Sequence, residues 1–296
     1  MLALRLAEHL PIEIVSCDSQ QVYAGMDIGT GKPTIVERRL VPHHLLDIVV
    51  PTETFHAARW AALARVAIHH IAERGRVPVI VGGTGLYLRA LLSGLFEAPP
   101  SDPTIRERHK HEAEAHGVEA LHTRLAVVDP RTAARVLPRD LLRISRALEV
   151  YEQTGIPIST LRTQQVAPAD ISAATLVLDP PLDVLRDRIG RRFDAMIAAG
   201  LLKEARDLRA RFGSDARALQ ALGYRQIGEH LDGLLTLDEA VAVAKAATSA
   251  YARRQRTWFR KEVDAWRVEA PPEPGDVAAW WKSSPVLPPA SNSRPS

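Results

Sequence analysis

Asp18 is the side chain of this sequence best placed to do chemistry. It follows a short β-branched segment, residues 11–16, and is itself followed by the polar residues Ser19, Gln20 and Gln21. A carboxylate just past the end of a strand can accept a proton from a bound molecule, and its neighbours can hydrogen-bond a planar polar substrate. The same residues also fit an Asx turn or a helix cap. The pattern therefore leaves a general base and a structural carboxylate both open.

A second segment, Gly29–Lys32, contains part of a phosphate-binding pattern. A P-loop needs GxxxxGK followed by Ser or Thr, so that successive N–H groups surround the phosphates and the hydroxyl reaches magnesium. Here Met26 stands where the first glycine is needed, and Pro33 stands where the hydroxyl is needed. We therefore expect a glycine turn, although Lys32 could still face an anion.

Two other segments could hold an anion. The glycine turn of residues 82–85 follows a buried-strand pattern, and Thr84 with the N-terminus of the next helix could approach a ligand. Tight packing between strand and helix is the alternative. Arg188 and Arg192 are four residues apart on a predicted helix and could grip a diphosphate together. A solvated helix face with nearby aspartates explains these arginines as well.

The strongest anomaly in charge is the segment 253–261, which carries five Lys or Arg side chains in nine positions. Arg253, Arg256 and Arg260 fall on one face of a predicted helix, and Trp258 lies among them. A basic helix with interleaved aromatic residues suits an RNA backbone with stacked bases. An acidic protein surface or a membrane face is the alternative.

The composition excludes several classes of protein. With 38 Lys and Arg against 35 Asp and Glu the net charge is only +3, so any basic surface must be local. Cys17 is the single cysteine, which excludes internal disulfides and fits a reducing compartment; we expect a buried side chain there, not a nucleophile. His43 and His44 are adjacent and no HExxH or CxxC occurs, so no zinc site is expected. Without a long apolar run or a signal-peptide pattern, we expect a soluble cytoplasmic protein that binds no membrane.

Strands that alternate with helices must position these groups. Strand-like runs occur at residues 11–16, 77–81 and 175–178, and helical periodicity at residues 57–74 and from about 86 to 92. This alternation predicts an α/β fold whose parallel sheet is flanked by helices.

A helical subdomain interrupts this predicted fold. Residues 99–168 are charged and helix-forming, whereas residues 1–98 and 169–282 are expected to form the α/β catalytic core with its C-terminal helices. Residues 283–296 are rich in Ser and Pro and are predicted to be a disordered tail. The chain opens directly on a helical pattern at Leu2, so the strand that usually leads such a domain is expected to be absent.

Six segments in a fixed order resemble those of the bacterial tRNA dimethylallyltransferases, over about residues 1–268. They are Ser16–Pro33, Pro42–Asp47, Gly82–Tyr87, Arg143–Val150, Gly223–Gln226 and Arg253–Arg260. The resemblance implies a P-loop-NTPase-like parallel sheet with an inserted helical subdomain and a helical C-terminal region. It also implies a Mg²⁺-dependent transfer of the dimethylallyl group from dimethylallyl diphosphate to N6 of the adenine at tRNA position 37. The partner would be the tRNA anticodon stem-loop, and we expect a monomer.

The resemblance also implies roles for individual residues. Asp18 matches the family's base, Arg192 matches an arginine that handles the diphosphate, and Thr84 matches a catalytic position that also touches tRNA. Asp18 is implied to touch tRNA as well. The other positions implied to contact tRNA are Ser19, Gln20, Gln21, Arg106, Leu142, Arg143, Ile144, Ser145, Arg146, Gln220, Gly223, Tyr224, Arg225, Arg253, Arg254, Gln255, Arg256, Thr257, Trp258, Phe259 and Arg260.

This sequence departs from the family pattern in three places. Leu142 stands where the family commonly has Gln, and Gln220 where a basic residue is frequent, so each should weaken tRNA binding modestly. Family members also begin with a strand and a GPTxSGKT-type P-loop, whereas here Met1 falls just after that loop. We therefore expect the chain as printed to be nearly inactive, and a version extended upstream to be active.

Three alternative functions stay open from the sequence. A small-molecule adenylate dimethylallyltransferase would share the core but would have no use for the helical insertion or the basic segment. A P-loop nucleotide kinase would transfer a phosphoryl group from ATP. A catalytically inactive tRNA-binding module would hold an anticodon stem-loop, with steep salt dependence and no turnover.

Overall fold

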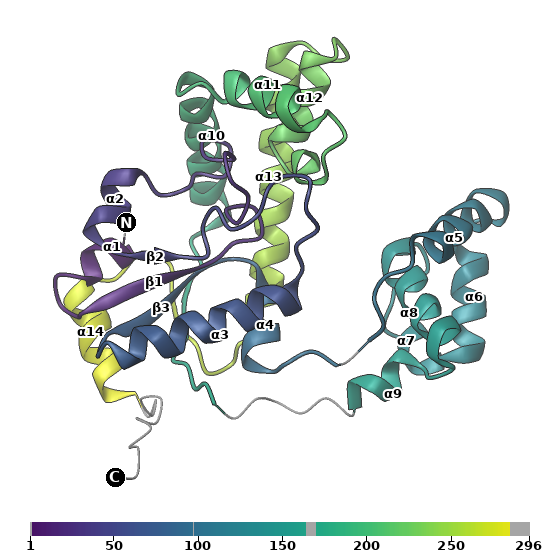
Figure 1. The fold of residues 1–296 in the computed structure, drawn as a ribbon, viewed down its shortest axis with the longest axis horizontal. Helices are drawn as coiled ribbons and strands as arrows, with labels where there is room; N and C mark the ends of the chain where they lie inside the picture. Colours follow the sequence, from purple (N-terminus) through teal and green to yellow (C-terminus); the bar gives the residue numbers. More distant parts are fainter. Residues whose placement is uncertain (1, 97, 164–169, 285–296) are drawn as a thin grey trace. The chain divides into compact units, whose positions relative to one another are not determined.

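The computed structural model describes residues 2–96, 98–163 and 170–284, which fall into two compact units (Figure 1). The core unit comprises Met1–Leu92 and Ala169–Ser296, and the helical unit comprises Ser93–Pro168. The helical unit therefore begins at Ser93, ahead of the boundary expected at residue 99. Of the expected tail, Ser283 still belongs to a helix, and residues 285–296 lie outside the described residues.

The sheet of the core unit has three parallel strands in the order β2-β1-β3. These strands are β1 (Ile12–Cys17), β2 (His43–His44) and β3 (Val77–Gly82). All six residues of the central strand β1 are buried, as expected for a strand with neighbours on both edges. The strands predicted at 11–16 and 77–81 are confirmed. The two-residue strand β2 was not predicted, because so short a segment carries no periodic pattern.

The strand predicted at 175–178 exists but lies in a different sheet from the one expected. It is β4 (Leu176–Leu178), and it pairs in parallel with β5 (Trp266–Val268) to form a separate two-stranded sheet. A run of apolar residues predicts a strand but not its partner, and the partner here lies far along the chain. Leu176 and Trp266 pack against the apolar cluster that includes Ile12 and Ile14, so the small sheet still shares a core with β1.

Helices cover this core. The periodicity predicted at residues 57–74 is confirmed, and its apolar stripe buries Trp60, Ala64, Ile68 and Ile71. The helices around the sheet are α1 (Leu2–Leu6), α2 (Ile35–Leu40), α3 (Ala57–Glu73), α4 (Gly85–Leu92) and α14 (Pro274–Ser283).

A second group of helices completes the core unit. They are α10 (Leu182–Ala198), α11 (Leu201–Phe212), the 3-10 turn η1 (Arg217–Gln220), α12 (Tyr224–Leu231) and α13 (Leu237–Phe259). The 23-residue α13 begins with a capping box between Thr236 and Glu239, and Figure 1 shows it running beside α10. The basic segment predicted to be helical lies at its C-terminal end.

The helical unit has a core of its own. Leu121, Leu125, Ile144, Leu148 and Ile158 are among its buried residues. Its helices are α5 (Pro103–His116), α6 (Val118–Val128), α7 (Pro130–Ala133), α8 (Leu141–Thr154) and α9 (Ile158–Thr163), and its described residues contain no strand, as predicted. In neither unit do the described residues form a helix that is both long and apolar enough to cross a bilayer.

Candidate active site

Asp18 lies directly after β1 with its two carboxylate oxygens in different environments. Oδ1 accepts hydrogen bonds from the backbone N–H groups of Gln20 at 2.7 Å and Gln21 at 3.3 Å, which makes an Asx turn. Within the described parts of the chain, Oδ2 has no hydrogen-bond partner or ion pair. The two interpretations of Asp18 are therefore compatible, because the turn fixes the carboxylate and leaves one oxygen able to accept a proton.

Thr84 is held next to Asp18 by the loop after β3. Its Oγ1 accepts a hydrogen bond from Ser19 N at 3.1 Å, and its own N–H donates to Cys17 O at 3.2 Å. A Cβ on Gly82 would lie 2.2 Å from the Cys17 carbonyl oxygen, so glycine is required for this approach. The glycine turn thus packs the ends of β1 and β3 tightly and, in doing so, brings Thr84 next to Asp18.

Helix α13 covers the other side of this loop. Gln255 Nε2 donates to Gly83 O at 2.9 Å, and the indole of Trp258 lies where a Cβ on Gly85 would be. The Tyr251 hydroxyl contacts the side chains of Thr84 and Gln255. Burial, reinforced by the Asp18 charge, raises the pKa of Tyr251, so the phenol stays protonated as a hydrogen-bond donor.

The thiol of Cys17, next to Asp18, has a raised pKa. Cys17 is buried, and burial together with the neighbouring Asp18 carboxylate raises the pKa of its thiol to about 12. A thiol with that pKa carries almost no thiolate at neutral pH. The prediction that Cys17 is a buried side chain is confirmed.

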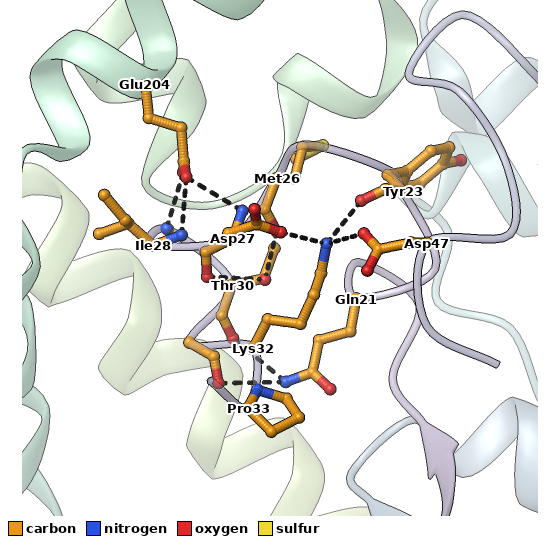
Figure 2. Close-up of polar contacts among 12 residues, drawn as sticks. Gln21, Tyr23, Met26, Asp27, Ile28, Thr30, Lys32, Pro33, Asp47 and Glu204 are labelled. Carbon is orange, nitrogen blue, oxygen red and sulfur yellow. Dashed lines mark hydrogen bonds and ion pairs between the residues drawn. The ribbon is translucent and has the colours of Figure 1, made fainter. Parts of the chain in front are cut away.

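The GTGK segment folds as a glycine turn that binds carboxylates of the protein itself (Figure 2). The backbone N–H groups of Asp27, Ile28 and Gly29 donate to the Glu204 carboxylate at 2.8–3.1 Å. Lys32 has a side chain only 1% exposed and faces two aspartates. The expected failure of the P-loop pattern is therefore confirmed, and the anions that Lys32 faces are side chains of this chain.

Arg192 reaches this turn from α10. Its Nη2 donates to Thr30 O at 3.0 Å, and a Cβ on Gly31 would lie 2.3 Å from the same nitrogen. The side chain is exposed, and its remaining N–H groups meet no hydrogen-bond or ion-pair partner among the described residues. Gln21 Nε2 lies 3.4 Å from the carbonyl oxygens of Thr30 and Gly31, so the polar segment after Asp18 is joined to the turn that holds Arg192.

Some basic residues at the C-terminal end of α13 contact other side chains of the protein, and others do not. Arg256 forms an ion pair with Asp179 in which both side chains are less than 20% exposed. The Arg254 guanidinium lies 5.5 Å from the centre of the Tyr251 ring. Arg253 and Arg260 are exposed and make no ion pair or side-chain hydrogen bond within the described ranges. Of the face predicted to carry three arginines toward RNA, two are therefore free and Arg256 is held by the fold.

The segment 220–225 also contains both buried and exposed residues. Tyr224 is 2% exposed, and its hydroxyl donates to Glu204, so its side chain supports the turn and is not open to a partner. Burial and the Glu204 carboxylate raise the pKa of this phenol. Gly223 is buried as well, whereas Gln220 and Arg225 are exposed.

In the helical unit a buried carboxylate organises two of the predicted tRNA-contacting arginines. Glu149 is fully buried and accepts hydrogen bonds from Arg146 at 2.6 Å and from Arg106 at 3.2 Å. Burial alone would raise the pKa of Glu149, but these guanidinium groups and the Asp102 N–H lower it below the usual value. The buried charge is therefore compensated, and the arginines are held in place.

The neighbouring positions of α8 differ in how accessible they are. Leu142 is 82% exposed and the Arg143 side chain 72% exposed, while Ile144 and Ser145 are buried. Only part of the 142–146 segment thus offers side chains to a partner.

Comparison with known proteins places these features in a family. The sequence pattern of the IPP transferases matches residues 21–262, most of the chain. The chain belongs to the IPP transferase family.

Individual relatives agree with this membership. The tRNA dimethylallyltransferase of Anaeromyxobacter dehalogenans (strain 2CP-C) is 50% identical over 277 residues, which is 94% of this chain and 93% of the relative. That of Symbiobacterium thermophilum is 48% identical over 88% of this chain and 82% of the relative.

Solved structures of IPP transferases match the fold. The tRNA isopentenylpyrophosphate transferase of Bacillus halodurans aligns with a TM-score of 0.67 and 37% identity, over 95% of this chain and 90% of that one. A eukaryotic dimethylallyltransferase acting on tRNA aligns with a TM-score of 0.74 and 26% identity, over 94% and 71% of the two chains. The predicted α/β fold with a small parallel sheet is therefore confirmed.

Several residues of this IPP transferase site were not identified from its sequence. Tyr251, Glu204 and Asp47 lie at or beside the groups predicted to act. Tyr251 and Glu204 belong to segments without a recognisable local motif, whereas Asp47 ends the segment Pro42–Asp47 but was given no role there. Tyr251 lies just two positions before the basic segment, so a wider boundary for that segment would have included it. No local signal marks Glu204, because the turn that it binds lies 175 or more residues away in sequence.

Proposed function

We propose that this protein transfers a dimethylallyl group from dimethylallyl diphosphate to N6 of an adenine in tRNA, at position 37 beside the anticodon. The observation that carries the proposal is the carboxylate of Asp18, which is fixed through Oδ1 and free at Oδ2. Membership of the IPP transferase family and relatives named tRNA dimethylallyltransferase support the same reaction.

The reaction needs a base and an acceptor of negative charge. The adenine N6 attacks the allylic carbon, an N–C bond forms, and the C–O bond to the diphosphate breaks with its electron pair leaving on oxygen. The amine is a weak nucleophile because its lone pair is delocalised into the ring, so loss of its proton to Asp18 Oδ2 drives the step forward. The free N–H groups of Arg192 would stabilise the diphosphate as it departs.

Thr84 and Tyr251 complete the site by hydrogen bonding. The Thr84 hydroxyl already accepts from Ser19 N, so its proton can be directed to a substrate oxygen. Tyr251 lies beside Thr84, and its raised pKa keeps the phenol protonated. We expect these two hydroxyls to orient substrate rather than to exchange protons with it.

Recognition of tRNA is proposed to use the exposed cations of both units. In the core unit these are Arg253 of α13, Arg260 just after that helix and Arg225 of α12; in the helical unit Arg143 is exposed as well, with 72% of its side chain accessible. Guanidinium groups suit the phosphates of an anticodon stem-loop, whose target adenine must leave its stack to reach a carboxylate. The remaining positions expected to touch tRNA stay part of this proposal through their backbone or their exposed atoms.

Magnesium is proposed to act with the diphosphate. Among the described residues no three His, Cys, Asp or Glu side chains gather closely enough to hold a metal ion. The Thr84 hydroxyl would nevertheless be an oxygen donor that suits Mg²⁺ when the phosphates supply most of its other ligands. When bound, the ion would neutralise charge on the leaving group.

The proposed setting is the cytoplasm, and the proposed state is a monomer. Asp18, Thr84, Tyr251 and Arg192 all belong to the core unit of one chain, so a second copy is not needed to complete the site. Light scattering on a size-exclusion column measures the mass, and a dimer in the micromolar range would contradict the monomer.

A single-turnover assay tests the reaction. Radiolabelled dimethylallyl diphosphate, Mg²⁺ and a synthetic anticodon stem-loop with adenine at position 37 are mixed with excess enzyme, and label in the RNA is measured. A stem-loop with guanine at that position is the matched control, because it lacks the N6 amine. The assay is run on the 296-residue chain and on one carrying the family's phosphate-binding loop ahead of Met1, since the resemblance predicts that this loop holds the diphosphate.

The expected result is label in the adenine stem-loop and none in the guanine one. Label transferred to AMP but not to RNA would identify a small-molecule enzyme. Salt-dependent RNA binding without label from either chain would identify a binding module and overturn the proposed reaction.

A further inference from the structure

The geometry points to Lys32 as a positioning residue for Arg192: with Glu204 it holds the turn of residues 27–31 in the one conformation that presents a carbonyl to the arginine. The inference rests on the proposed function, in which Arg192 binds the diphosphate. It assigns a role to a buried ammonium group that the proposed reaction does not otherwise use.

The Lys32 ammonium group has a complete set of partners (Figure 2). Nζ donates to Asp47 Oδ1 at 2.6 Å, to Asp27 Oδ1 at 2.7 Å and to Tyr23 O at 2.9 Å. An ammonium group has three N–H donors, so all three are used. A buried charge that is fully hydrogen-bonded is held rigidly, because breaking any one contact leaves a charged donor without water.

Asp47 connects the Lys32 ammonium group to Arg38 of α2. Its backbone has a φ of 56°, in the left-handed region that residues other than glycine seldom adopt. Its second oxygen accepts from Arg38 Nη1 at 2.7 Å, and Arg38 Nε donates to Pro33 O at 2.9 Å. Strained backbone persists where surrounding contacts over-determine it, and Lys32 and Arg38 supply those contacts here.

Glu204 fixes the opposite side of the same turn. Its carboxylate accepts the N–H groups of Asp27, Ile28 and Gly29, and Thr30 Oγ1 donates to Met26 O at 2.6 Å within the turn. The Glu204 carboxylate therefore holds the turn through its backbone N–H groups, and the Lys32 ammonium group holds it through Asp27 and Asp47. Among the described residues, neither Lys32 nor Glu204 makes a hydrogen bond or ion pair with Arg192.

Arg192 depends on the turn for the one hydrogen bond that it makes to a described residue. Nη2 donates to Thr30 O, and Gly31, with a φ of 59°, leaves the space that the guanidinium occupies. Since only one N–H is anchored, the others can point together at an anion. A shift of the turn would move the Thr30 carbonyl and release an exposed, flexible side chain, which would then have to be ordered again whenever diphosphate binds.

A double-mutant cycle tests this coupling. Isothermal calorimetry measures the Kd of inorganic diphosphate, with Mg²⁺ present, for Lys32→Met, Arg192→Ala, the double variant and the unaltered chain. Lys203→Met is the matched control, because that lysine is 78% exposed and pairs only with Asp207 one turn away. Thermal melts and circular dichroism establish that each variant is folded.

We expect Lys32→Met to weaken diphosphate binding about tenfold when Arg192 is present and less than about twofold when it is absent, a coupling in the range seen for residues of one network. In the prenylation assay the KM for dimethylallyl diphosphate should rise similarly, with the KM for the stem-loop almost unchanged. Lys203→Met should change neither.

Equal losses in both Arg192 backgrounds would show a general structural role and overturn the inference. No loss on Lys32→Met, or no diphosphate binding by the unaltered chain, would overturn it too. If Lys32→Met does not fold, Asp47→Asn takes its place in the same cycle, because Asp47 accepts from Lys32, and it must show the same dependence on Arg192. Coupled diphosphate binding without prenylation would refute the proposed reaction and leave the role of Lys32 standing.

Discussion

Asp18 uses one oxygen to shape its own turn, and the proposed reaction uses the other as a proton acceptor. Asn at this position would still accept the N–H groups of Gln20 and Gln21 through its amide oxygen, but it could not take a proton. We expect Asp18→Asn to lower the single-turnover rate by about 10²- to 10⁴-fold, with stem-loop affinity changed less than about twofold. Rapid-quench kinetics and fluorescence anisotropy measure the two quantities. A rate within threefold of the unaltered enzyme would exclude Asp18 as the base.

Cys17 offers a second test at the scale of one atom. Because burial and Asp18 raise the pKa of its thiol to about 12, the folded protein should hold it as the unreactive thiol at pH 8.5. Iodoacetamide should therefore leave the native protein unmodified by mass spectrometry, and should alkylate it fully in urea. Rapid labelling of the native state would mean that the strand end opens far more often than its packing implies.

Strand β1 is fastened to its neighbours by a buried carboxylate. Glu13 is 4% exposed and accepts hydrogen bonds from Arg74 and His44. We expect Glu13→Gln to lower the free energy of unfolding by about 1.5–3 kcal/mol at pH 7, the range for hydrogen bonds to charged groups. Urea denaturation measures this loss.

The same residue sets a pH dependence. Burial alone would raise the pKa of Glu13, but Arg74 and His44 lower it below its usual value. A lowered pKa contributes stability above the unfolded-state pKa, and this contribution disappears as the pH falls through the folded-state value. The difference in stability between the unaltered protein and Glu13→Gln should therefore shrink from pH 6 toward pH 3. A difference that grows on acidification would contradict the assignment.

The arginines at the C-terminal end of α13 are expected to have two different roles, RNA binding and stabilisation of the fold. Arg253 and Arg260 are free, so changing either to Ala should weaken stem-loop binding and reduce the slope of log K against log salt by about 0.7–0.9 if one phosphate contact is lost. Arg256 is paired with Asp179, so Arg256→Ala should mainly lower the melting temperature. Anisotropy titrations at several salt concentrations and thermal melts distinguish the two effects. Identical behaviour of all three variants would remove the distinction.

At the scale of the whole molecule, the helical unit has what an independent domain needs. Its buried leucines and isoleucines form a separate cluster, and Asp102, Asp129 and Asp140 cap three of its helices. We expect residues 93–168, expressed alone, to be helical and to unfold cooperatively, as measured by circular dichroism. A gradual, non-cooperative melt would show that its core depends on the rest of the chain.

Much of this architecture was predictable from sequence because its signals are local. The runs at 11–16 and 77–81 and the periodicity at 57–74 each fall within one element, and each was found there. The partner of β4 and the ion pair between Arg256 and Asp179 were not predictable, because each joins segments far apart in the sequence. Around Asp18 the local motif was enough to predict Asp18 and Thr84 as site residues, whereas Tyr251 and Glu204 are recognisable only once the fold brings them to the site.

The contact between Glu204 and the turn of residues 27–29 has a consequence for nucleotides. The three amides that a phosphate would need are already bound by a carboxylate from the same chain, so a nucleotide would compete with a tethered ligand present at very high effective concentration. Millimolar ATP should therefore leave the amide resonances of Asp27, Ile28 and Gly29 unmoved. The segment that resembles half of a nucleotide-binding motif therefore already has the Glu204 carboxylate bound to its backbone N–H groups.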